Sequence, residues 1–206
     1  MDIRTFLYLL PIVLASLTLH ELAHAYVAWR LGDPTAKREG RLTLNPLVHL
    51  DPLGTLMFAV TALAANLPFG WARPVPVNPN HFRRPREGMA IVALAGPLMN
   101  FAVALVALAL VRHVEMGGQL FEVLSKAWIV NVVLGIFNLV PVPPLDGSRI
   151  VGVLMDNATY SRWVGFDQYG MVIIFGLFIL FQDEFTRLMG DALVFVRDVM
   201  DVLVLA

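Results

Sequence analysis

The sequence predicts an α-helical polytopic membrane protein, and its composition, apolar segments and charge distribution carry that prediction. The chain has 206 residues, of which 58% are hydrophobic and 15% are charged. An ordinary soluble domain is about 45–50% apolar and about 25% charged. The net charge of −1 gives no global attraction for nucleic acid, and the lack of cysteine excludes disulfides and thiol chemistry. The length predicts a single domain, 1–206.

Long apolar stretches predict the membrane-spanning helices, because a bilayer core about 30 Å thick needs roughly 20 apolar residues. The stretches have few or no charges, and four are expected to span: 5–29, 88–111, 127–145 and 170–181, the last extending back through Phe166. Prolines at 141, 143 and 144 must end any helix in the third stretch.

The segment 53–67 is also apolar but short, and Pro68 closes it. Basic residues flank it on both sides in the sequence, in the loops 37–41 and 73–86. Basic loops near membrane ends lie on the cytoplasmic side. If both loops are cytoplasmic, this segment enters and leaves on one side, so we expect a re-entrant or interfacial element rather than a true span. The amino terminus would then lie on the outer side.

The C-terminal stretch 182–206 mixes acidic and basic residues with apolar residues at near-helical spacing. This pattern is typical of an amphipathic helix, which either lies at the membrane interface or packs on its neighbours. We therefore expect a core over about 5–150, followed by a C-terminal span and amphipathic helix over about 166–206.

Three ionisable residues interrupt the first apolar stretch in the pattern HELAH, residues 20–24. On a helix, His20 and His24 lie on one face about 6 Å apart along the axis, so both imidazoles reach one zinc ion. Glu21 is placed to act on a water there without binding the metal. Ionisable groups at membrane depth are costly and indicate function. The alternative is a purely structural role, in which these residues form a buried polar network between helices.

A catalytic zinc site needs a third protein ligand. Asp146 is the candidate, because it follows an uncharged segment and a proline-rich turn, and Gly147 permits a sharp bend. The alternative is that Asp146 caps a helix beginning at Ser148. The sequence allows both roles.

Three separated blocks resemble the site-2 protease family of intramembrane zinc metalloproteases. They are the HELAH motif, the run AGPLMN at 95–100 and the run NLVPVPPLDG at 138–147. The loop 69–79 is similar to one in compact prokaryotic members without a PDZ domain, and the chain has no room for a PDZ-like or nucleotide-binding module.

The resemblance implies that His20, His24 and Asp146 bind one zinc ion and that Glu21 is the general base toward a zinc-activated water. It implies hydrolysis of a peptide bond in or near the transmembrane segment of a membrane-anchored protein. It gives Asn138, and with it Asn100, a role in binding the substrate or the transition state. Interhelical hydrogen bonding is the alternative for both asparagines. The protein would be a multi-pass cell-membrane enzyme with its site nearer the cytoplasm.

Two nearby features are expected to support the site. His49 and Asp51 are candidates to hydrogen-bond the metal ligands. The alternating stretch 41–45 predicts either an edge strand that pairs with an extended substrate or an ordinary surface hairpin.

Two other function classes fit parts of the pattern. Another class of membrane metalloprotease pairs HExxH with a later glutamate, but Glu115, Glu122 and Glu184 do not lie in apolar helices. A non-proteolytic metal-binding protein or metal transporter would also use a His/Asp cluster. Transporters tend to have paired interrupted helices in two halves, and this sequence has no such symmetry.

Overall fold

The computed structural model describes residues 1–65 and 68–205, and the secondary structure of these residues is helical apart from an isolated antiparallel bridge between Leu50 and Ala72. The elements in chain order are α1 (Ile3–Arg30), α2 (Thr35–Arg38), η1 (Pro46–Val48), α3 (Pro52–Ala65), η2 (Pro79–His81), α4 (Pro85–Val111), α5 (Gln119–Leu139), α6 (Asp146–Gly152), α7 (Asn157–Gly165), α8 (Asp167–Leu180) and α9 (Gln182–Leu205).

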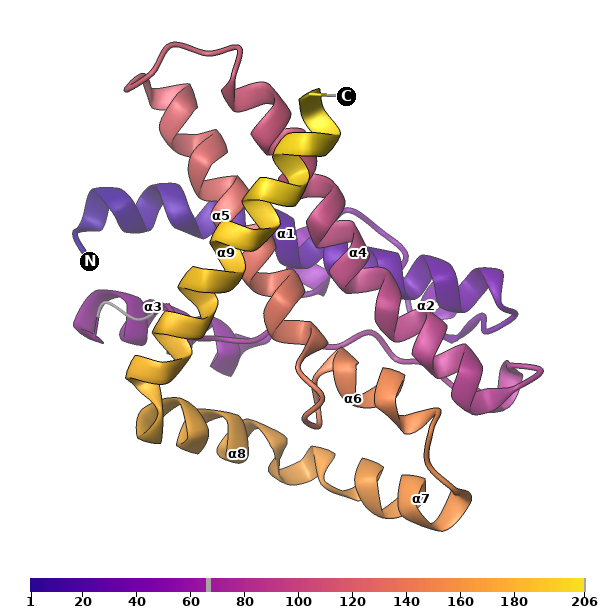
Figure 1. Ribbon diagram of the computed structural model, residues 1–206. Helices are drawn as coiled ribbons and strands as arrows, with labels where there is room; N and C mark the ends of the chain where they lie inside the picture. The colour runs from indigo at the N-terminus through magenta and orange to yellow at the C-terminus, as the bar shows by residue number, and fades with distance from the viewer. Residues whose placement is uncertain (66–67, 206) are drawn as a thin grey trace.

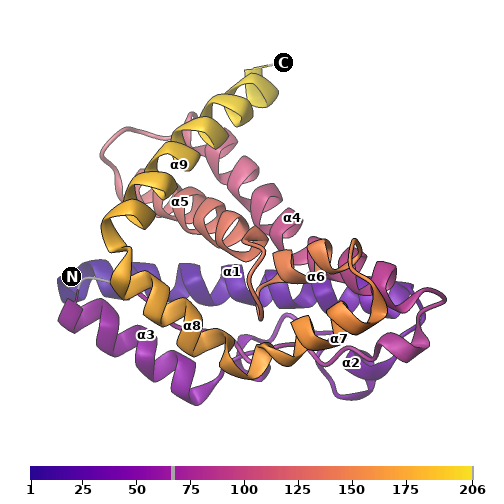
Figure 2. The same cartoon turned by 60° about the horizontal axis from the view of Figure 1, so that its bottom comes forward.

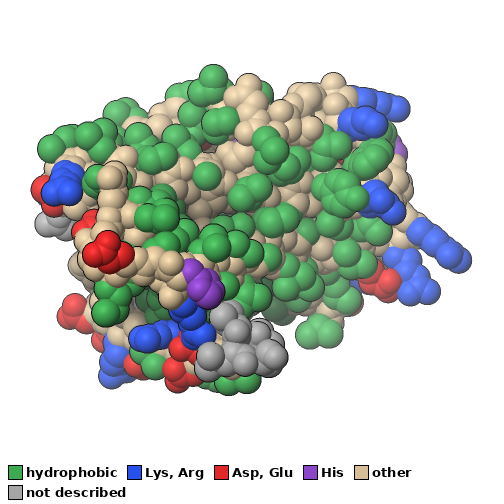
Figure 3. All heavy atoms as spheres, turned by 90° about the horizontal axis from the view of Figure 1, so that it is seen from above, with side chains coloured by type: hydrophobic (Ala, Val, Ile, Leu, Met, Phe, Trp, Pro, Cys, Tyr) green, Lys and Arg blue, Asp and Glu red, His purple; other side chains and the backbone are tan. Residues whose placement is uncertain are grey.

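The centre of the fold is formed by α1, α4 and α5, which Figure 1 shows crossing one another near the middle of the molecule. Among the described residues, these are the three helices long and apolar enough to cross a membrane. Many large hydrophobic side chains on them are exposed, such as Leu7, Leu98 and Val106. Figure 3 shows one face covered largely by hydrophobic side chains, with lysine and arginine mainly at its edges. A lipid bilayer is the solvent that suits such a surface.

The predicted spans agree with α1 and α4 to within a few residues, whereas α5 is shifted. It begins at Gln119 and ends at Leu139, before the proline-rich turn. Pro141 explains why α5 ends at Leu139. Proline has no backbone N–H to donate, and in a helix its ring would clash with the carbonyl of the residue four positions before it.

The prediction of a fourth span at 170–181 is wrong for the described residues. Here α8 has 14 residues, which corresponds to about 21 Å at 1.5 Å per residue and is shorter than a bilayer core of about 30 Å. The helix ends at Leu180, and the chain turns into α9 at Phe181.

The segment 53–67, which was predicted to be re-entrant, forms the short helix α3. Residues 66 and 67 of this segment lie outside the described residues. Asp51 accepts a hydrogen bond from the backbone N–H of Gly54 at 2.7 Å in the first turn. A Cβ on Gly54 would lie 2.2 Å from the Trp71 carbonyl oxygen, so the helix and the following chain approach closely only because this residue is glycine. With 14 residues, α3 is also too short to cross a bilayer as a simple span.

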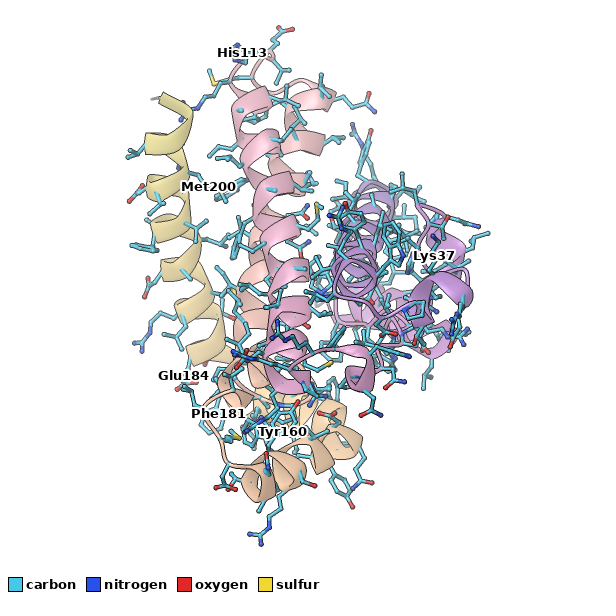
Figure 4. The ribbon with its side chains drawn as sticks, turned by 90° about the vertical axis from the view of Figure 1, so that its right-hand side faces the viewer. Lys37, His113, Tyr160, Phe181, Glu184 and Met200 are labelled. Carbon is cyan, nitrogen blue, oxygen red and sulfur yellow. The ribbon has the colours of Figure 1, made fainter. Side chains whose placement is uncertain are left out.

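The C-terminal stretch forms the helix α9, and part of its apolar surface packs on the central helices. Met200 is buried against Ala104 and Leu108 of α4 and Val132 of α5. Figure 4, in which α1 is seen nearly along its axis, shows Met200 pointing from α9 toward the neighbouring helices. Asp201 pairs with Arg112 at 2.6 Å. Leu193 and Val196 pack on the same cluster, whereas Leu188 and Val199 of this helix are exposed, so packing on neighbours accounts for part of its apolar surface.

The loop after α1 contains a fully buried carboxylate, Asp33. Its oxygens accept hydrogen bonds from both the N–H and the hydroxyl of Thr35 and from the N–H of Asn78, and one of them lies 2.9 Å from Nδ1 of His81. Burial raises the pKa of Asp33, but these hydrogen bonds outweigh it and hold the pKa below its ordinary value. The network ties the end of α1 to the chain that leads into α4.

We therefore expect Asp33→Asn to destabilise the fold at neutral pH by about 1–3 kcal/mol, the range for hydrogen bonds to charged groups. Because the folded pKa is depressed, the stabilisation is fully present above the unfolded pKa of about 3.9 and is lost as the pH falls through the lower folded value. Thermal unfolding in detergent between pH 3 and pH 7 checks this. A difference between wild type and variant that stays constant down to pH 3 would contradict it.

Candidate metal centre

Two histidines of α1 face each other in the interior, as the i, i+4 spacing predicts. Nε2 of His20 lies 3.0 Å from Nε2 of His24, and both residues are buried, as is Glu21 between them in the sequence. The helix is apolar around them, so the sequence places three polar groups where water is scarce.

The third member of the group is Asp146, the first residue of α6. Its Oδ2 lies 3.3 Å from Nε2 of each histidine. Figure 2 shows the start of α6 beside the middle of α1. A Cβ on Gly147 would lie 2.1 Å from the carbonyl oxygen of Leu139, so glycine permits the turn that brings the aspartate in. The N-cap of α6 is Leu145 and no side chain caps the helix, so the capping alternative for Asp146 is excluded.

These three side chains fit a metal ion. Their ligand atoms all lie within 4.8 Å of one another. Oδ2 of Asp146 is buried and has no hydrogen-bond partner among the described residues, which is costly unless a cation satisfies it. Two imidazoles and a carboxylate are the donor set of a catalytic zinc site with an open position.

The other ring nitrogens of the histidines are held by acceptors. Nδ1 of His20 lies 2.6 Å from Oδ1 of Asn100, and Nδ1 of His24 lies 2.8 Å from the carbonyl oxygen of Val92. Each acceptor requires a proton on Nδ1, so in the neutral rings both Nε2 lone pairs face the shared space. Two lone pairs and a carboxylate oxygen facing one another favour a cation between them.

The network continues away from the metal centre. Asn100 donates from Nδ2 to Oδ1 of Asn131 at 2.9 Å, and Asn131 donates to the hydroxyl of Ser16 at 2.8 Å. Both asparagines are fully buried. This position of Asn100 favours the interhelical hydrogen bonding that the sequence left open, with the added effect of orienting His20.

The expected support by His49 and Asp51 is not what the structure shows. Nε2 of His49 lies 3.0 Å from the Thr43 carbonyl oxygen, and Asp51 bonds to the start of α3. Asn100 and the Val92 carbonyl occupy the positions on the metal histidines that His49 and Asp51 were expected to take.

The edge strand predicted at 41–45 does not form in the described chain. Asn45 instead accepts the N–H of Leu47 and caps the short helix η1, while the Arg41 side chain turns inward. Capping competes with strand pairing for this backbone.

A cavity of about 670 Å³ opens beside the metal centre. Its lining includes His20, Glu21, His24, Asn138, Asp146 and Arg149, together with apolar residues of the segment 68–77. Asn138 lines this cavity, and its Nδ2 donates to the Leu134 carbonyl oxygen at 2.9 Å. One oxygen of Glu21, Oε2, accepts the N–H of Val75 at 2.9 Å. Glu122, one of the glutamates considered as an alternative third metal ligand, pairs instead with Lys126 at 3.5 Å.

Sequence reasoning missed several supporting residues. Asn131 and Ser16 are polar residues in apolar helices, which is the signal that could have found them. Val75 acts through its backbone N–H, which carries no side-chain signal. The Arg41 guanidinium bonds to carbonyls more than 30 residues away in the sequence.

Gly96 of α4 packs directly on the two histidines. A Cβ there would lie 2.4 Å from Nε2 of His24 and 2.5 Å from Cε1 of His20. The absence of a side chain at this glycine therefore lets α4 approach the two histidine rings closely.

We expect Gly96→Ala to push the imidazoles apart and to lower zinc affinity by about 10–100-fold, the range seen when the support of metal ligands is disturbed. Competition titration with a zinc chelator measures this. Gly176→Ala is the matched control, because a Cβ there meets nothing within 4 Å. Equal zinc affinity in Gly96→Ala and wild type would show that the rings are not confined as described.

Comparison with known proteins finds a matching family and several relatives of this chain. The model of "Peptidase family M50" matches residues 112–182, which include Asn138 and Asp146. The chain is 42% identical over 182 residues to "Putative zinc metalloprotease YwhC" of Bacillus subtilis, covering 84% of this chain and 80% of that protein. It is 31% identical over 168 residues to "Putative zinc metalloprotease Rip2" of Mycolicibacterium smegmatis, covering 81% of this chain and 64% of Rip2.

A more distant relative is "Zinc metalloprotease MJ0392" of Methanocaldococcus jannaschii, 26% identical over 71% of this chain and 34% of that protein. No solved structure matches the chain. The similarity to YwhC extends over most of both proteins, and the donor set suits zinc. The chain therefore belongs to peptidase family M50, and it is a zinc metalloprotease.

Proposed function

We propose that this protease hydrolyses a peptide bond in or near the transmembrane segment of a membrane-anchored protein. One observation carries the proposal. Two buried histidines and the half-buried Asp146 lie with Glu21 beside a cavity that is lined in part by helices apolar enough to cross a bilayer. Ionisable groups are expensive in that setting and mark a functional site.

His20, His24 and Asp146 hold the zinc ion in this proposal. Zinc bound there acidifies a water molecule toward neutrality and polarises a carbonyl oxygen. The three residues differ in how they are supported. Hydrogen bonds from Nδ1 fix each imidazole, whereas the proline turn and α6 position the aspartate by backbone geometry.

Glu21 is the general base. It takes a proton from the attacking water and passes it to the leaving amine, so no covalent intermediate with the protein is needed. One carboxylate oxygen, Oε2, bonds to the Val75 N–H, which leaves Oε1 to receive the proton. Asn138 lines the same cavity and offers an amide to the substrate backbone or to the developing oxyanion.

An apolar approach to the site supports a membrane-embedded substrate. A second cavity of about 290 Å³ lies between α1, α3 and α5. Its lining shares Leu17, Trp71, Val133 and Leu134 with the first cavity, so the two adjoin. A helical substrate must unwind before its amides become accessible. Substrates should therefore carry helix-weakening residues near the cleaved bond.

The site lies nearer the cytoplasmic side in this proposal. His24 is six residues before the end of α1 at Arg30, which corresponds to about 9 Å along the helix. The loops on either side of α3 contain the basic residues that favour the cytoplasm. We place α3 as a re-entrant or interfacial element and the chain 1–206 as one multi-pass domain of the cell membrane.

Glu21→Gln tests the chemistry. We expect cleavage to fall by at least about 100-fold, the contribution of a positioned base, while zinc content stays at the wild-type level because Glu21 is not a ligand. The assay uses a detergent-solubilised reporter whose single apolar segment contains glycine and proline, with the cleaved bond identified by mass spectrometry.

The matched control is Glu115→Gln, since Glu115 is exposed in the turn between α4 and α5. It should cleave at the wild-type rate. Loss of zinc in Glu21→Gln would favour a metal-binding protein that uses Glu21 as a ligand. Full cleavage in Glu21→Gln would remove Glu21 from the mechanism.

A further inference from the structure

The carboxylate of Glu21 is bonded to one peptide group of an extended segment, residues 71–78. Its Oε2 accepts the N–H of Val75 at 2.9 Å. The carbonyl of that same peptide group belongs to Pro74, and it accepts a hydrogen bond from the Arg41 guanidinium at 3.2 Å. A trans peptide group is planar, with its oxygen and hydrogen pointing in opposite directions. The guanidinium, the peptide group and the carboxylate therefore form one chain of hydrogen bonds.

Val75 lies between two residues that cannot donate a backbone hydrogen bond. Pro74 and Pro76, on either side of Val75, have no N–H of their own. The segment is tied at one end by the Arg73 N–H, which donates to the His49 carbonyl at 2.8 Å. Its other end is tied by the Asn78 N–H, which donates to Asp33 at 2.6 Å. The Val75 N–H is thus a fixed donor aimed at Glu21.

Arg41 is unusual for a surface-loop arginine because only 5% of it is exposed. The same guanidinium nitrogen, NH2, also donates to the Arg73 carbonyl, so it holds two consecutive carbonyls of the segment. Burial and the neighbouring Arg73 lower the pKa of Arg41, and the attraction of Glu21 and Glu39 opposes this shift. An arginine remains protonated in proteins, so the loop keeps a buried cation on the far side of the peptide group from Glu21.

We propose that Arg41 is a positioning residue for Glu21, acting through the Pro74–Val75 peptide group. The guanidinium polarises this peptide group and fixes its orientation, because consecutive hydrogen bonds strengthen one another in a medium of low dielectric. The Val75 N–H then holds Oε2 of Glu21 and leaves the other oxygen for proton transfer. The inference rests on the proposed role of Glu21 as general base.

The test compares zinc-loaded, full-length variants on the reporter substrate, with kcat and KM measured separately. Arg41→Met removes the cation, and Val75→Pro removes the N–H. Each should lower kcat by about 10–100-fold, the usual effect of losing a group that orients a metal-site residue. KM and zinc content should stay unchanged. Arg41→Lys should recover part of kcat, and Val75→Ala, which keeps the N–H, should lose much less than Val75→Pro.

Two further measurements separate positioning from general damage. Arg38→Met removes an exposed cation from the same region of the chain and should retain wild-type kcat. The double variant Arg41→Met/Val75→Pro should lose little more than either single variant, because both changes break one chain of hydrogen bonds. Losses that multiply would show two independent effects and overturn the inference.

The outcomes distinguish this inference from the proposed function. If Glu21→Gln abolishes cleavage but Arg41→Met and Val75→Pro keep wild-type kcat, the inference fails and the proposed function stands. If Glu21→Gln retains cleavage, the proposed function itself fails. If Arg41→Met does not fold, the difference in kcat between Val75→Pro and Val75→Ala decides, and equal values overturn the inference.

Discussion

Two imidazoles and one carboxylate converge in an apolar interior, and this convergence constrains how α1, α4 and the start of α6 pack. Oδ2 of Asp146 lies 3.3 Å from both histidine Nε2 atoms and has no other partner among the described residues. Without a cation, burying this oxygen would cost several kcal/mol. A zinc ion held by His20, His24 and Asp146, as proposed, would remove that cost and would join α1 to the start of α6, two segments more than a hundred residues apart. The close contact of Gly96 with the imidazoles and the proline turn before Asp146 both serve this convergence.

Backbone groups supply hydrogen bonds that orient side chains of the candidate metal centre. The Val92 carbonyl orients one histidine and the Val75 N–H holds Glu21, whereas a polar chain from Ser16 through two asparagines orients the other histidine. Such contacts satisfy polar groups that would otherwise be unpaired at membrane depth. They also fix the protonated nitrogen of each ring, so the metal-facing nitrogen is set before any ion binds.

The sequence predicts the long helices and the His20/His24 pair, because hydrophobic length and i, i+4 spacing are local properties, whereas Asp146 was expected from its proline-rich turn and from the resemblance to the site-2 protease family. It fails where the outcome depends on distant contacts. The expected support from His49 is instead supplied by Asn100, which a single sequence does not place beside His20. The fourth span fails because 14 residues of α8 are helical and the chain then turns. The alternation in 41–45 predicts an edge strand or a surface hairpin, whereas the Arg41 side chain is buried and bonds to the carbonyls of Arg73 and Pro74, contacts that leave no periodic pattern in the sequence.

The most direct test of this account is the zinc content of detergent-purified protein, wild type against Asp146→Ala. We expect one zinc ion per wild-type chain and a loss or strong weakening of binding in the variant, because the carboxylate would complete the three-ligand site. Zinc bound equally tightly in the variant would show that the third ligand is another residue. Absence of zinc from the wild type, even after zinc is supplied, would contradict the metal centre altogether.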